Sequence, residues 1–368
     1  MQIITKKIHE TEYAYILELP SFYEDCCYID IETTGFDRNR HMIYLVGLIF
    51  QTKDTFYLQQ YLCDKESDEY ELLYRINQQL SQYKYLVHFN GQSFDLPFIK
   101  SRLALYQIKE EISGCQSIDY YQALKPYKGF LRIENLKLKT VEQLLGYKRL
   151  DPFSGGELIE LYHMYVQGNE KLKPILLLHN EEDMMGLYYL NAFYPLFTLF
   201  YEKTMPINYH KETAPNHLDS LVLSASIPQS KHYYTFTHQT PYGHVEILHD
   251  RLICSLPVYT GILKHFYSNY KDYYYLPVED YAIHKSVAGY VHHDYKKKAT
   301  KTTAYVKKKD TYIRCPLSEK EIKRLQTPHK SIKLFHADTD ETFTYIQIDD
   351  FKTIAYTLFS AITKAILF

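Results

Sequence analysis

The chain reads Cys27-Tyr28-Ile29-Asp30-Ile31-Glu32-Thr33-Thr34-Gly35 near its N-terminus, a run of strand formers that two carboxylates interrupt. Side chains two apart on a strand point to the same face, so Asp30 and Glu32 lie side by side. Like charges repel, and a buried sheet face normally excludes them. A divalent cation such as Mg2+ would stabilise the pair, because it prefers carboxylate oxygens. The alternative is the solvated face of an edge strand.

Length and composition bound the class of protein. The 368 residues suggest two domains of about 150 residues each. With 46% hydrophobic and 23% charged residues, the chain has the composition of a globular protein. A net charge of −2 excludes a globally basic nucleic-acid binder, so any such surface must be a local patch. The six cysteines form no C-x-x-C pair, which indicates reduced thiols rather than a zinc site or disulfides.

Targeting signals are not evident in the sequence. The stretch Met1–Lys7 has no apolar signal-peptide region, and the apolar stretch 353–368 is too short to span a bilayer. We therefore expect a cytoplasmic protein without membrane association. No feature indicates an obligate protein partner.

The hydrophobic pattern predicts three regions: an N-terminal extension over residues 1–21, an α/β domain over 22–201 and a smaller α+β domain over 202–368. Proline-rich, weakly periodic sequence near residue 202 marks the second boundary. In the α/β domain, strand-like runs with short loops predict an antiparallel meander, and helical patterns follow. The predicted strands are 13–19, 26–32, 42–50, 55–61 and 85–89, and the main helices are 67–83, 93–105, 156–166 and 172–200.

Short aromatic strands and a few helices are predicted for the C-terminal region. The strands are expected at 232–238, 244–249 and 252–257. The helices are expected at 279–291, at Ser318–Leu325 with a Ser318-x-x-Glu321 capping box, and at 349–368.

Further acidic residues fall on predicted helices. Asp95 follows Asn90-Gly91 in the first turn of a helix, where an anion suits the helix dipole. His179 and Asp183 are four residues apart and share one helical face. Each has an ordinary alternative: Asp95 as an N-terminal helix acid, and the His179–Asp183 pair as a surface contact.

The ordered set of an Asp-x-Glu strand, an Asn-Gly turn before Asp95 and a His179-x-x-x-Asp183 helix resembles the DnaQ-like, or DEDD, 3'-5' exonuclease superfamily. The match is closest to its YprB-type branch and covers roughly residues 22–200. The resemblance implies a ribonuclease H-like fold, with a mixed five-stranded sheet flanked by helices. Supporting residues are Asp119, Leu138-Lys139-Thr140-Val141-Glu142, Tyr162 and Asn180.

The resemblance also implies the site residues and their roles. Asp30, Glu32, Asp95 and Asp183 would ligate two divalent cations, Mg2+ or Mn2+, with Asp30 between them. His179 would be the general base of phosphodiester hydrolysis, in agreement with the two-metal chemistry of such reactions. The sequence departs from the DnaQ pattern in one respect, because His179 lies four rather than five residues before the final Asp.

Neighbouring residues are expected to meet the substrate. Thr33, Gly35 and Asn90 would lie at the terminal nucleotide, and Phe94 is either a stacking wedge or a core residue. Asp119 reads as a structural residue that caps the next helix. His88, on an alternating strand, reads as a core residue or a neighbour of the site.

A lysine-rich segment stands out in the C-terminal region, with tyrosines interleaved. A basic, aromatic β-hairpin from Lys296 to Arg314 would grip a nucleic-acid backbone through Lys296, Lys297 and Lys307. The alternative is a solvated loop. The histidines in this region lack metal-ligand spacing, which argues against zinc.

We therefore predict a metal-dependent 3'-5' exonuclease whose partner is nucleic acid, DNA or RNA, with a single-stranded 3' end. Two alternatives stay open. One is a ribonuclease H-like binding module with weak or no catalysis, and the other is a structure-specific endonuclease on the same fold.

Overall fold

The computed structural model divides the chain into two compact units, one built mainly of Met1–Thr198 and the other mainly of residues that follow Leu199. This division lies close to the boundary expected at residue 202. The structure describes residues 1–8, 24–53, 55–201, 207–213, 219–227, 234–248, 250–315, 317, 319–325, 332–338, 343–352 and 361–363.

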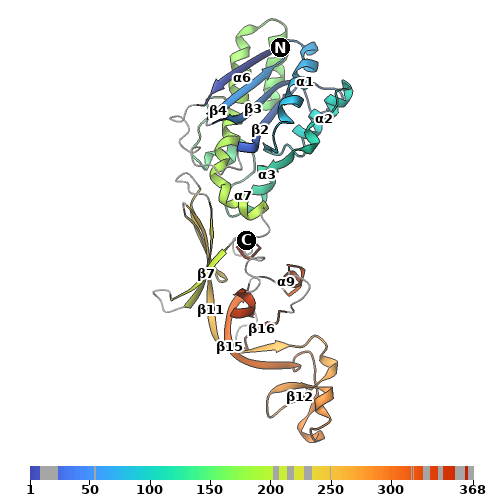
Figure 1. The fold of residues 1–368 in the computed structure, drawn as a ribbon, viewed down its shortest axis with the longest axis vertical. Helices are drawn as coiled ribbons and strands as arrows, with labels where there is room; N and C mark the ends of the chain where they lie inside the picture. Colours follow the sequence, from blue (N-terminus) through green and yellow to red (C-terminus); the bar gives the residue numbers. More distant parts are fainter. Residues whose placement is uncertain are drawn as a thin grey trace. The chain divides into compact units, whose positions relative to one another are not determined.

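The first unit contains a mixed six-stranded sheet flanked by helices, which confirms the predicted α/β class (Figure 1). Its strands run in the order β1 (Gln2–Lys7), β4 (Thr55–Leu62), β3 (Ile43–Thr52), β2 (Cys26–Thr33), β5 (Tyr85–His88) and β6 (Gln116–Asp119). β2, β3 and β4 pair antiparallel, as the meander predicts. β5 pairs parallel with β2 and with β6.

The sheet has six strands rather than five, because residues expected in an N-terminal extension form β1. Gln2–Lys7 pairs antiparallel with β4, and Ile4 faces Gln60 across the pair. Its side chains are mostly exposed, so the alternation that marks a half-buried strand is missing from the sequence. β1 covers the edge of β4 that would otherwise leave backbone groups unpaired. The strand expected at 13–19 lies outside the described residues.

Two faces of β2 carry different kinds of residues, as the period of a strand requires. Cys27, Ile29 and Ile31 join the hydrophobic core together with residues of helix α1 (Glu69–Leu80). The alternate residues face helix α6 (Lys173–Tyr189), where the Tyr28 and Tyr188 rings meet at 5.0 Å. Figure 1 shows α6 and α1 on the two sides of the sheet. Asp30 and Glu32 therefore project toward α6.

The helical segments of this unit follow the sequence expectation with one change. The helix expected over 172–200 is interrupted by a 3-10 turn at Leu190–Phe193, and Pro174 lies in its first turn as predicted. The remaining helices are α2 (Asp95–Leu105), α3 (Tyr120–Leu124), α4 (Leu138–Gln143), α5 (Gly155–Val166) and α7 (Tyr194–Tyr201).

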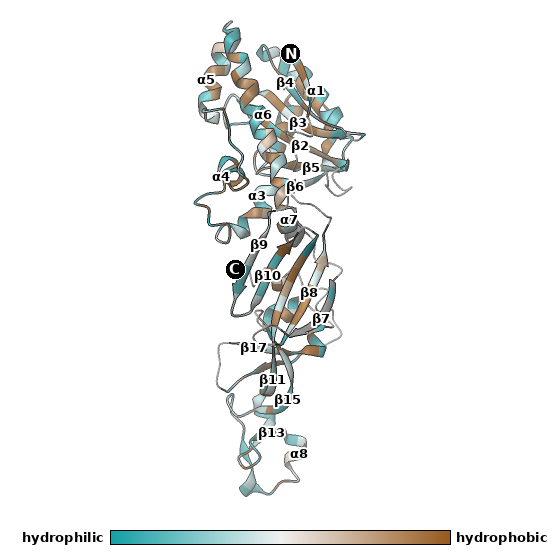
Figure 2. Cartoon of the chain, turned by 90° about the vertical axis from the view of Figure 1, so that its left-hand side faces the viewer, coloured by the Kyte–Doolittle hydropathy of each residue, from teal (hydrophilic) through white to brown (hydrophobic). Residues whose placement is uncertain are grey.

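The second unit is richer in strands than the expected α+β domain. One sheet has eight strands: β7 (Ile207–Thr213), β8 (Asp219–Ser226), β9 (Phe236–Thr240), β10 (Gly243–Leu248), β11 (Arg251–Phe266), β15 (Tyr305–Cys315), β16 (Leu334–His336) and β17 (Thr344–Gln347). A three-stranded sheet contains β12 (Tyr273–Leu276), β13 (Tyr281–His284) and β14 (Lys297–Lys298). Hydrophobic residues run along β8, which pairs with the long strand β11 (Figure 2).

Two predictions for this unit are wrong. The expected helix at 279–291 is replaced by β13 and the short helix α8 (Lys285–Ala288), because Tyr281–His284 pairs with β12. The expected basic hairpin does not form either, since β14 pairs with β12 whereas β15 pairs with β11.

Helix α9 (Glu319–Leu325) confirms the helix expected there, although Ser318 lies outside the described residues. Of the expected final helix, the described parts 349–352 and 361–363 are helical. Across the described part of the chain, we find no helix with the length and apolar character needed to cross a membrane.

Candidate active site

A close approach of α6 to the sheet brings the acidic residues of both together. Gly47 of β3 pairs with Asp30 across the strands, and a Cβ at Gly47 would lie 2.4 Å from Asn180 Oδ1 and 2.5 Å from Met184 Cγ. Real Cβ atoms essentially never come this close to another heavy atom, so a side chain at Gly47 would force Asn180 and Met184 of α6 to move. The helix residues His179 and Asp183 thereby reach the carboxylates of β2.

Asp30 is oriented by a chain of amides. Asn180 Nδ2 donates to Asp30 Oδ2 at 3.2 Å, and Gln60 Nε2 donates to Asn180 Oδ1 at 3.0 Å. Gln60 also donates to the Leu177 carbonyl at 2.8 Å, which fixes it between β4 and α6. The carboxylate of Asp30 is therefore held at one oxygen by a neutral donor.

Asp95 begins α2 and is 6% exposed. Its Oδ1 accepts a hydrogen bond from the Ile31 backbone N–H at 3.2 Å, which ties the start of α2 to the strand between Asp30 and Glu32. Burial raises the pKa of Asp95 to about 7, although backbone hydrogen bonds act in the opposite direction.

The four acids Asp30, Glu32, Asp95 and Asp183 are called the acidic cluster below. His179 lies between two of them. Its Nε2 is 3.2 Å from Asp183 Oδ2 and 3.5 Å from Glu32 Oε1. Its Nδ1 is 2.5 Å from Asp151 Oδ2. The carboxylate of Asp151 can only accept, so Nδ1 donates to it and Nε2 faces the cluster. Burial lowers the pKa of His179, but the hydrogen bond with Asp183 and the nearby negative charges outweigh burial and raise it to about 9.

The protein supplies too little positive charge near the acidic cluster to balance its carboxylates. Burial and the charge of Asp183 raise the pKa of Glu32 to about 8. Burial, with the charges of Asp183 and Asp95, raises the pKa of Asp30 well above its usual range. Burial opposes ionisation of Asp183 too, but the His179 hydrogen bond and the charge of Arg149 lower its pKa.

A divalent cation fits this donor set. Ligand atoms of Glu32, His179 and Asp183 all lie within 4.8 Å of one another. The side chains of Glu32 and Asp183 are 13% and 17% exposed, which leaves a path from solvent. Carboxylate oxygens are the ligands that Mg2+ and Mn2+ prefer, and a cation would relieve the repulsion that raises these pKa values. The residues present therefore suit a hard cation.

Sequence reasoning missed the residues between α4 and α5 that contact α6. Arg149 pairs with Asp183, and Asp151 holds His179. Glu142 was noted in the sequence, but its bidentate pairing with Arg149 was not expected. Arg149 and Asp151 lie in a loop without hydrophobic periodicity, so only the order Arg-x-Asp before the Ser154–Glu157 capping box could have drawn attention to them.

The residues expected to meet substrate lie at the end of β2, in the turn that follows it and in the turn before α2. Thr33 is buried and donates through Oγ1 to the Gly35 carbonyl at 2.8 Å, which shapes the turn after β2. Asn90 adopts a positive φ of 64° in the turn before α2. Phe94 is half-buried and meets the Phe36 ring at 6.3 Å. Phe36 is 85% exposed, an apolar surface that the sequence analysis did not single out.

Asp119 and His88 have structural roles, as expected. The Asp119 carboxylate caps α3 by accepting from the Tyr121 and Gln122 N–H groups, and it also accepts from the Asn90 N–H at 2.9 Å. His88 is fully buried and accepts the Gly91 N–H through Nδ1 at 3.1 Å.

The three lysines proposed from the sequence lie in the second unit and have different surroundings. Lys297 is exposed on β14. Lys296 Nζ lies 5.6 Å from the centre of the Tyr274 ring. Lys307 forms an ion pair with Asp280, whose carboxylate also accepts from the Tyr275 hydroxyl at 2.5 Å.

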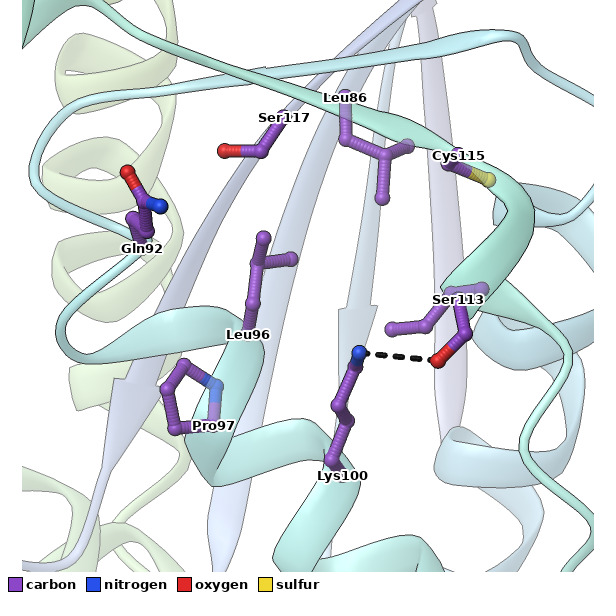
Figure 3. Close-up of a pocket in the computed structure, with 9 residues that line it drawn as sticks. Leu86, Gln92, Leu96, Pro97, Lys100, Ser113, Cys115 and Ser117 are labelled. Atoms are coloured by element: carbon purple, nitrogen blue, oxygen red, sulfur yellow. Dashed lines mark hydrogen bonds between the residues drawn. The ribbon is translucent and has the colours of Figure 1, made fainter.

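A hollow of about 250 Å3 lies between α2 and the β5–β6 edge, and none of the acidic cluster lines it (Figure 3). Lys100 Nζ donates to Ser113 Oγ at 3.0 Å across its rim, and Leu86, Leu96 and Cys115 provide apolar walls. It offers no group for phosphodiester chemistry.

Part of the chain matches a known protein family. Residues 27–193 match the family model of the RNase_H superfamily, and this segment contains the sheet strands β2–β6, α6 and every residue of the acidic cluster. Residues 27–193 form a ribonuclease H-like domain. The chain is 28% identical over 166 residues to the uncharacterized protein YprB of Bacillus subtilis (strain 168). That match covers 44% of this chain and 39% of YprB, so the chain spans well under half the length of this relative.

The solved structures that the chain matches include a DNA polymerase and an exonuclease. The family B DNA polymerase of Pyrobaculum calidifontis is 12% identical, with a TM-score of 0.40 over 88% of this chain and 39% of that one. Exonuclease I of Methylocaldum szegediense is 16% identical, with a TM-score of 0.29 over 60% of this chain and 53% of that one. The ribonuclease H-like domain itself rests on the family match and on the sheet described above.

Proposed function

We propose that the protein is a metal-dependent 3'-5' exonuclease that removes nucleotides from single-stranded 3' ends of DNA or RNA. The observation that carries the proposal is the convergence of Asp30 and Glu32 from β2 with His179 and Asp183 from α6, and the tie of Asp95 to the same strand. A nuclease on the ribonuclease H-like domain is the activity that this cluster fits best.

The four carboxylates are proposed to hold two divalent cations, Mg2+ or Mn2+. Bound there, the cations supply charge stabilisation for the attacking and leaving oxygens of a phosphodiester. The chain contributes the ligand oxygens and keeps them in place: Asn180 orients Asp30, and the Ile31 N–H orients Asp95.

His179 is proposed to take the proton of the attacking water at Nε2. Asp151 fixes the tautomer, because its carboxylate accepts the Nδ1 proton. With a pKa of about 9, His179 is protonated at neutral pH when Asp183 and Glu32 are uncompensated. The pKa falls toward neutrality once the charge of those two acids is balanced, as a general base requires.

The terminal nucleotide is proposed to lie over the turn after β2. Thr33 and Gly35 shape that turn, Asn90 shapes the facing one, and Phe94 supports the exposed ring of Phe36. An exposed aromatic ring beside buried carboxylates is suited to stack on an unpaired base.

The second unit is proposed to contact the nucleic-acid backbone through Lys296, Lys297 and Lys307. Lys297 is exposed and Tyr295 beside it is 60% exposed, so a phosphate and a base could be met together. Lys307 would have to share its charge with Asp280.

A panel of end-labelled single- and double-stranded DNA and RNA, with Mg2+ or Mn2+, tests the proposed function. We expect stepwise loss from a free 3' end, abolished by chelation. Asp30→Ala should remove the activity while the far-UV CD spectrum and melting temperature show an intact fold. Glu71→Gln, which removes an exposed acid of α1 paired with Arg75, is the matched control and should be fully active. Internal cuts would favour an endonuclease, and full activity in Asp30→Ala would refute the site.

A further inference from the structure

Three consecutive residues before α5, Arg149-Leu150-Asp151, lie along α6 and are called the 149–151 strap below. The Leu150 and Asp151 N–H groups donate to Glu182 Oε1 at 2.7 Å and Oε2 at 2.9 Å. The Asp151 carboxylate contacts the His179 ring, and the Arg149 guanidinium group pairs with the Asp183 carboxylate. The strap is thus fixed to α6 at its backbone and holds one site residue at each end.

All three nitrogens of the Arg149 guanidinium group donate hydrogen bonds to carboxylates. Its Nε donates to Glu142 Oε1 at 2.5 Å and its Nη2 to Glu142 Oε2 at 2.7 Å, a bidentate pair. Its Nη1 donates to Asp183 Oδ1. The side chains of Arg149 and Glu142 are 6% and 2% exposed, so the pair is shielded from solvent. The guanidinium group is planar, and Glu142 holds two of its nitrogens. The third nitrogen, Nη1, can therefore donate in one direction only.

A glycine of α6 makes room for the Glu142–Arg149 pair. A Cβ at Gly186 of α6 would lie 2.2 Å from Glu142 Oε2, so any other residue there would displace the Glu142 carboxylate from its place beside Arg149. Gly186 follows Asp183 by less than one helical turn, on the stretch of α6 that bears the site. The glycine therefore brings the Glu142–Arg149 pair within reach of Asp183.

We propose that Arg149 is a positioning residue for Asp183, and this inference rests on the proposed metal-dependent function. Arg149 occupies Oδ1 of Asp183, which leaves Oδ2 turned toward His179 Nε2 and the ligand atoms of Glu32. A metal-ligating carboxylate is commonly fixed in this way by a partner behind it, and loss of that partner weakens metal binding by about 10- to 100-fold.

A second buried pair in the same domain shows what a purely structural pair looks like. Arg102 Nε donates to Glu69 Oε1 at 2.8 Å, and the pair is 7% and 1% exposed. Glu69 also accepts from the Ile43 N–H at 2.8 Å and the Tyr106 hydroxyl at 3.0 Å. Among the described contacts, Arg102 makes none with the acidic cluster, whereas Arg149 donates to Asp183.

Titration of Mn2+ into the full-length wild type, Arg149→Gln and Arg102→Gln by calorimetry tests the proposal. We expect Arg149→Gln to weaken Mn2+ binding by about 10- to 100-fold. Arg102→Gln should lower the melting temperature and leave Mn2+ affinity unchanged. Raising the Mn2+ concentration should restore the kcat of Arg149→Gln, which a misfolded site would not allow.

Two outcomes separate failure of this proposal from failure of the proposed function. If the wild type binds no Mn2+, the metal-dependent function itself fails. If the wild type binds Mn2+ and folded Arg149→Gln binds it equally well, the role of Arg149 is overturned. Arg149→Lys keeps the buried positive charge and guards against misfolding. One amine cannot hold Glu142 and Asp183 in the fork geometry, so we expect weakened Mn2+ binding here too, and unchanged affinity would again overturn the proposal.

Discussion

Two buried histidines of the ribonuclease H-like domain each lie beside an aspartate, and their surroundings give them opposite properties. His88 accepts the Gly91 N–H through Nδ1 and meets Ser117 Oγ through Nε2 at 2.8 Å. Burial lowers the pKa of His88 to about 4, despite Asp119 3.6 Å away. His179 faces three carboxylates, and its pKa rises to about 9.

The difference lies in what each aspartate is already doing. Both carboxylate oxygens of Asp119 accept hydrogen bonds from backbone N–H groups, in the turn before α2 and at the start of α3. Asp151 accepts the Phe153 N–H and holds His179 at 2.5 Å. The comparison teaches that nearness of His and Asp does not mark a reactive pair. The second ring nitrogen of His179 faces Asp183 and Glu32, whereas that of His88 meets the uncharged Ser117 hydroxyl.

Removal of the two imidazoles should give the largest contrast. We expect His179→Gln to lower kcat for oligonucleotide hydrolysis by about 10²- to 10⁴-fold, the usual contribution of a general base. His88→Gln should leave kcat within about twofold and lower the melting temperature, because a buried, hydrogen-bonded ring is lost. Single-turnover kinetics and thermal melts measure both. Equal loss of kcat in the two variants would remove the distinction.

Replacement of the partner aspartates should give the next contrast. Asp151→Asn should lower kcat by about 10- to 100-fold, because an amide at this position no longer fixes the His179 tautomer. Asp119→Asn should act on stability instead, with about 1–3 kcal/mol lost as buried N–H groups lose an acceptor. Urea unfolding beside the kinetic assay separates the two effects. An active, destabilised Asp151→Asn would contradict the role assigned to Asp151.

Addition of Mg2+ should affect only one of the two histidine environments. Since the ion is proposed to bind the folded state, a free concentration ten times Kd should stabilise the protein by about 1.4 kcal/mol. His88→Gln should show the same rise in melting temperature as the wild type, whereas Asp30→Asn should show none. A rise that survives in Asp30→Asn would place the ion elsewhere.

The pH dependence of stability without metal should show the smallest contrast, below about 1.4 kcal/mol per pH unit for each group. The pKa of His179 is raised, so its contribution is complete below pH 6.5 and is lost as the pH rises through about 9. The pKa of His88 is lowered, so its contribution is complete above pH 6.5 and is lost as the pH falls through about 4.

Urea unfolding in EDTA at several pH values tests both directions. His179→Gln should flatten the decline in stability between pH 6.5 and about 9, to which Glu32 also contributes up to about pH 8. His88→Gln should flatten the acid decline. A steeper acid decline in His88→Gln than in the wild type would contradict the neutral state of His88.

The parts of the domain with a regular hydrophobic pattern or a recognisable motif could be predicted from the sequence. The meander and the shared face of Asp30 and Glu32 follow from strand alternation, and the shared face of His179 and Asp183 follows from helical spacing. β1 was missed because an exposed edge strand lacks alternation. Arg149 and Asp151 were missed because loop residues act through contacts that only the tertiary fold creates.

The second unit was predicted less well for a related reason. Lys297 and Lys307 are close in sequence, yet β14 and β15 pair with different strands. Long-range pairing partners cannot be read from local pattern, and β-propensity is weak evidence for which strands pair. The candidate site avoids this difficulty because its acids lie on strongly patterned elements.

One measurement tests the central claim most directly: anomalous diffraction from a crystal of the protein soaked in Mn2+. The proposed site predicts an anomalous peak bounded by Asp30, Glu32 and Asp183, and its loss in Asp30→Asn. The described chain holds one other cluster of possible ligands, His292, His293 and Asp294, which is fully exposed. A peak at that cluster alone, or no peak at all, would contradict the account.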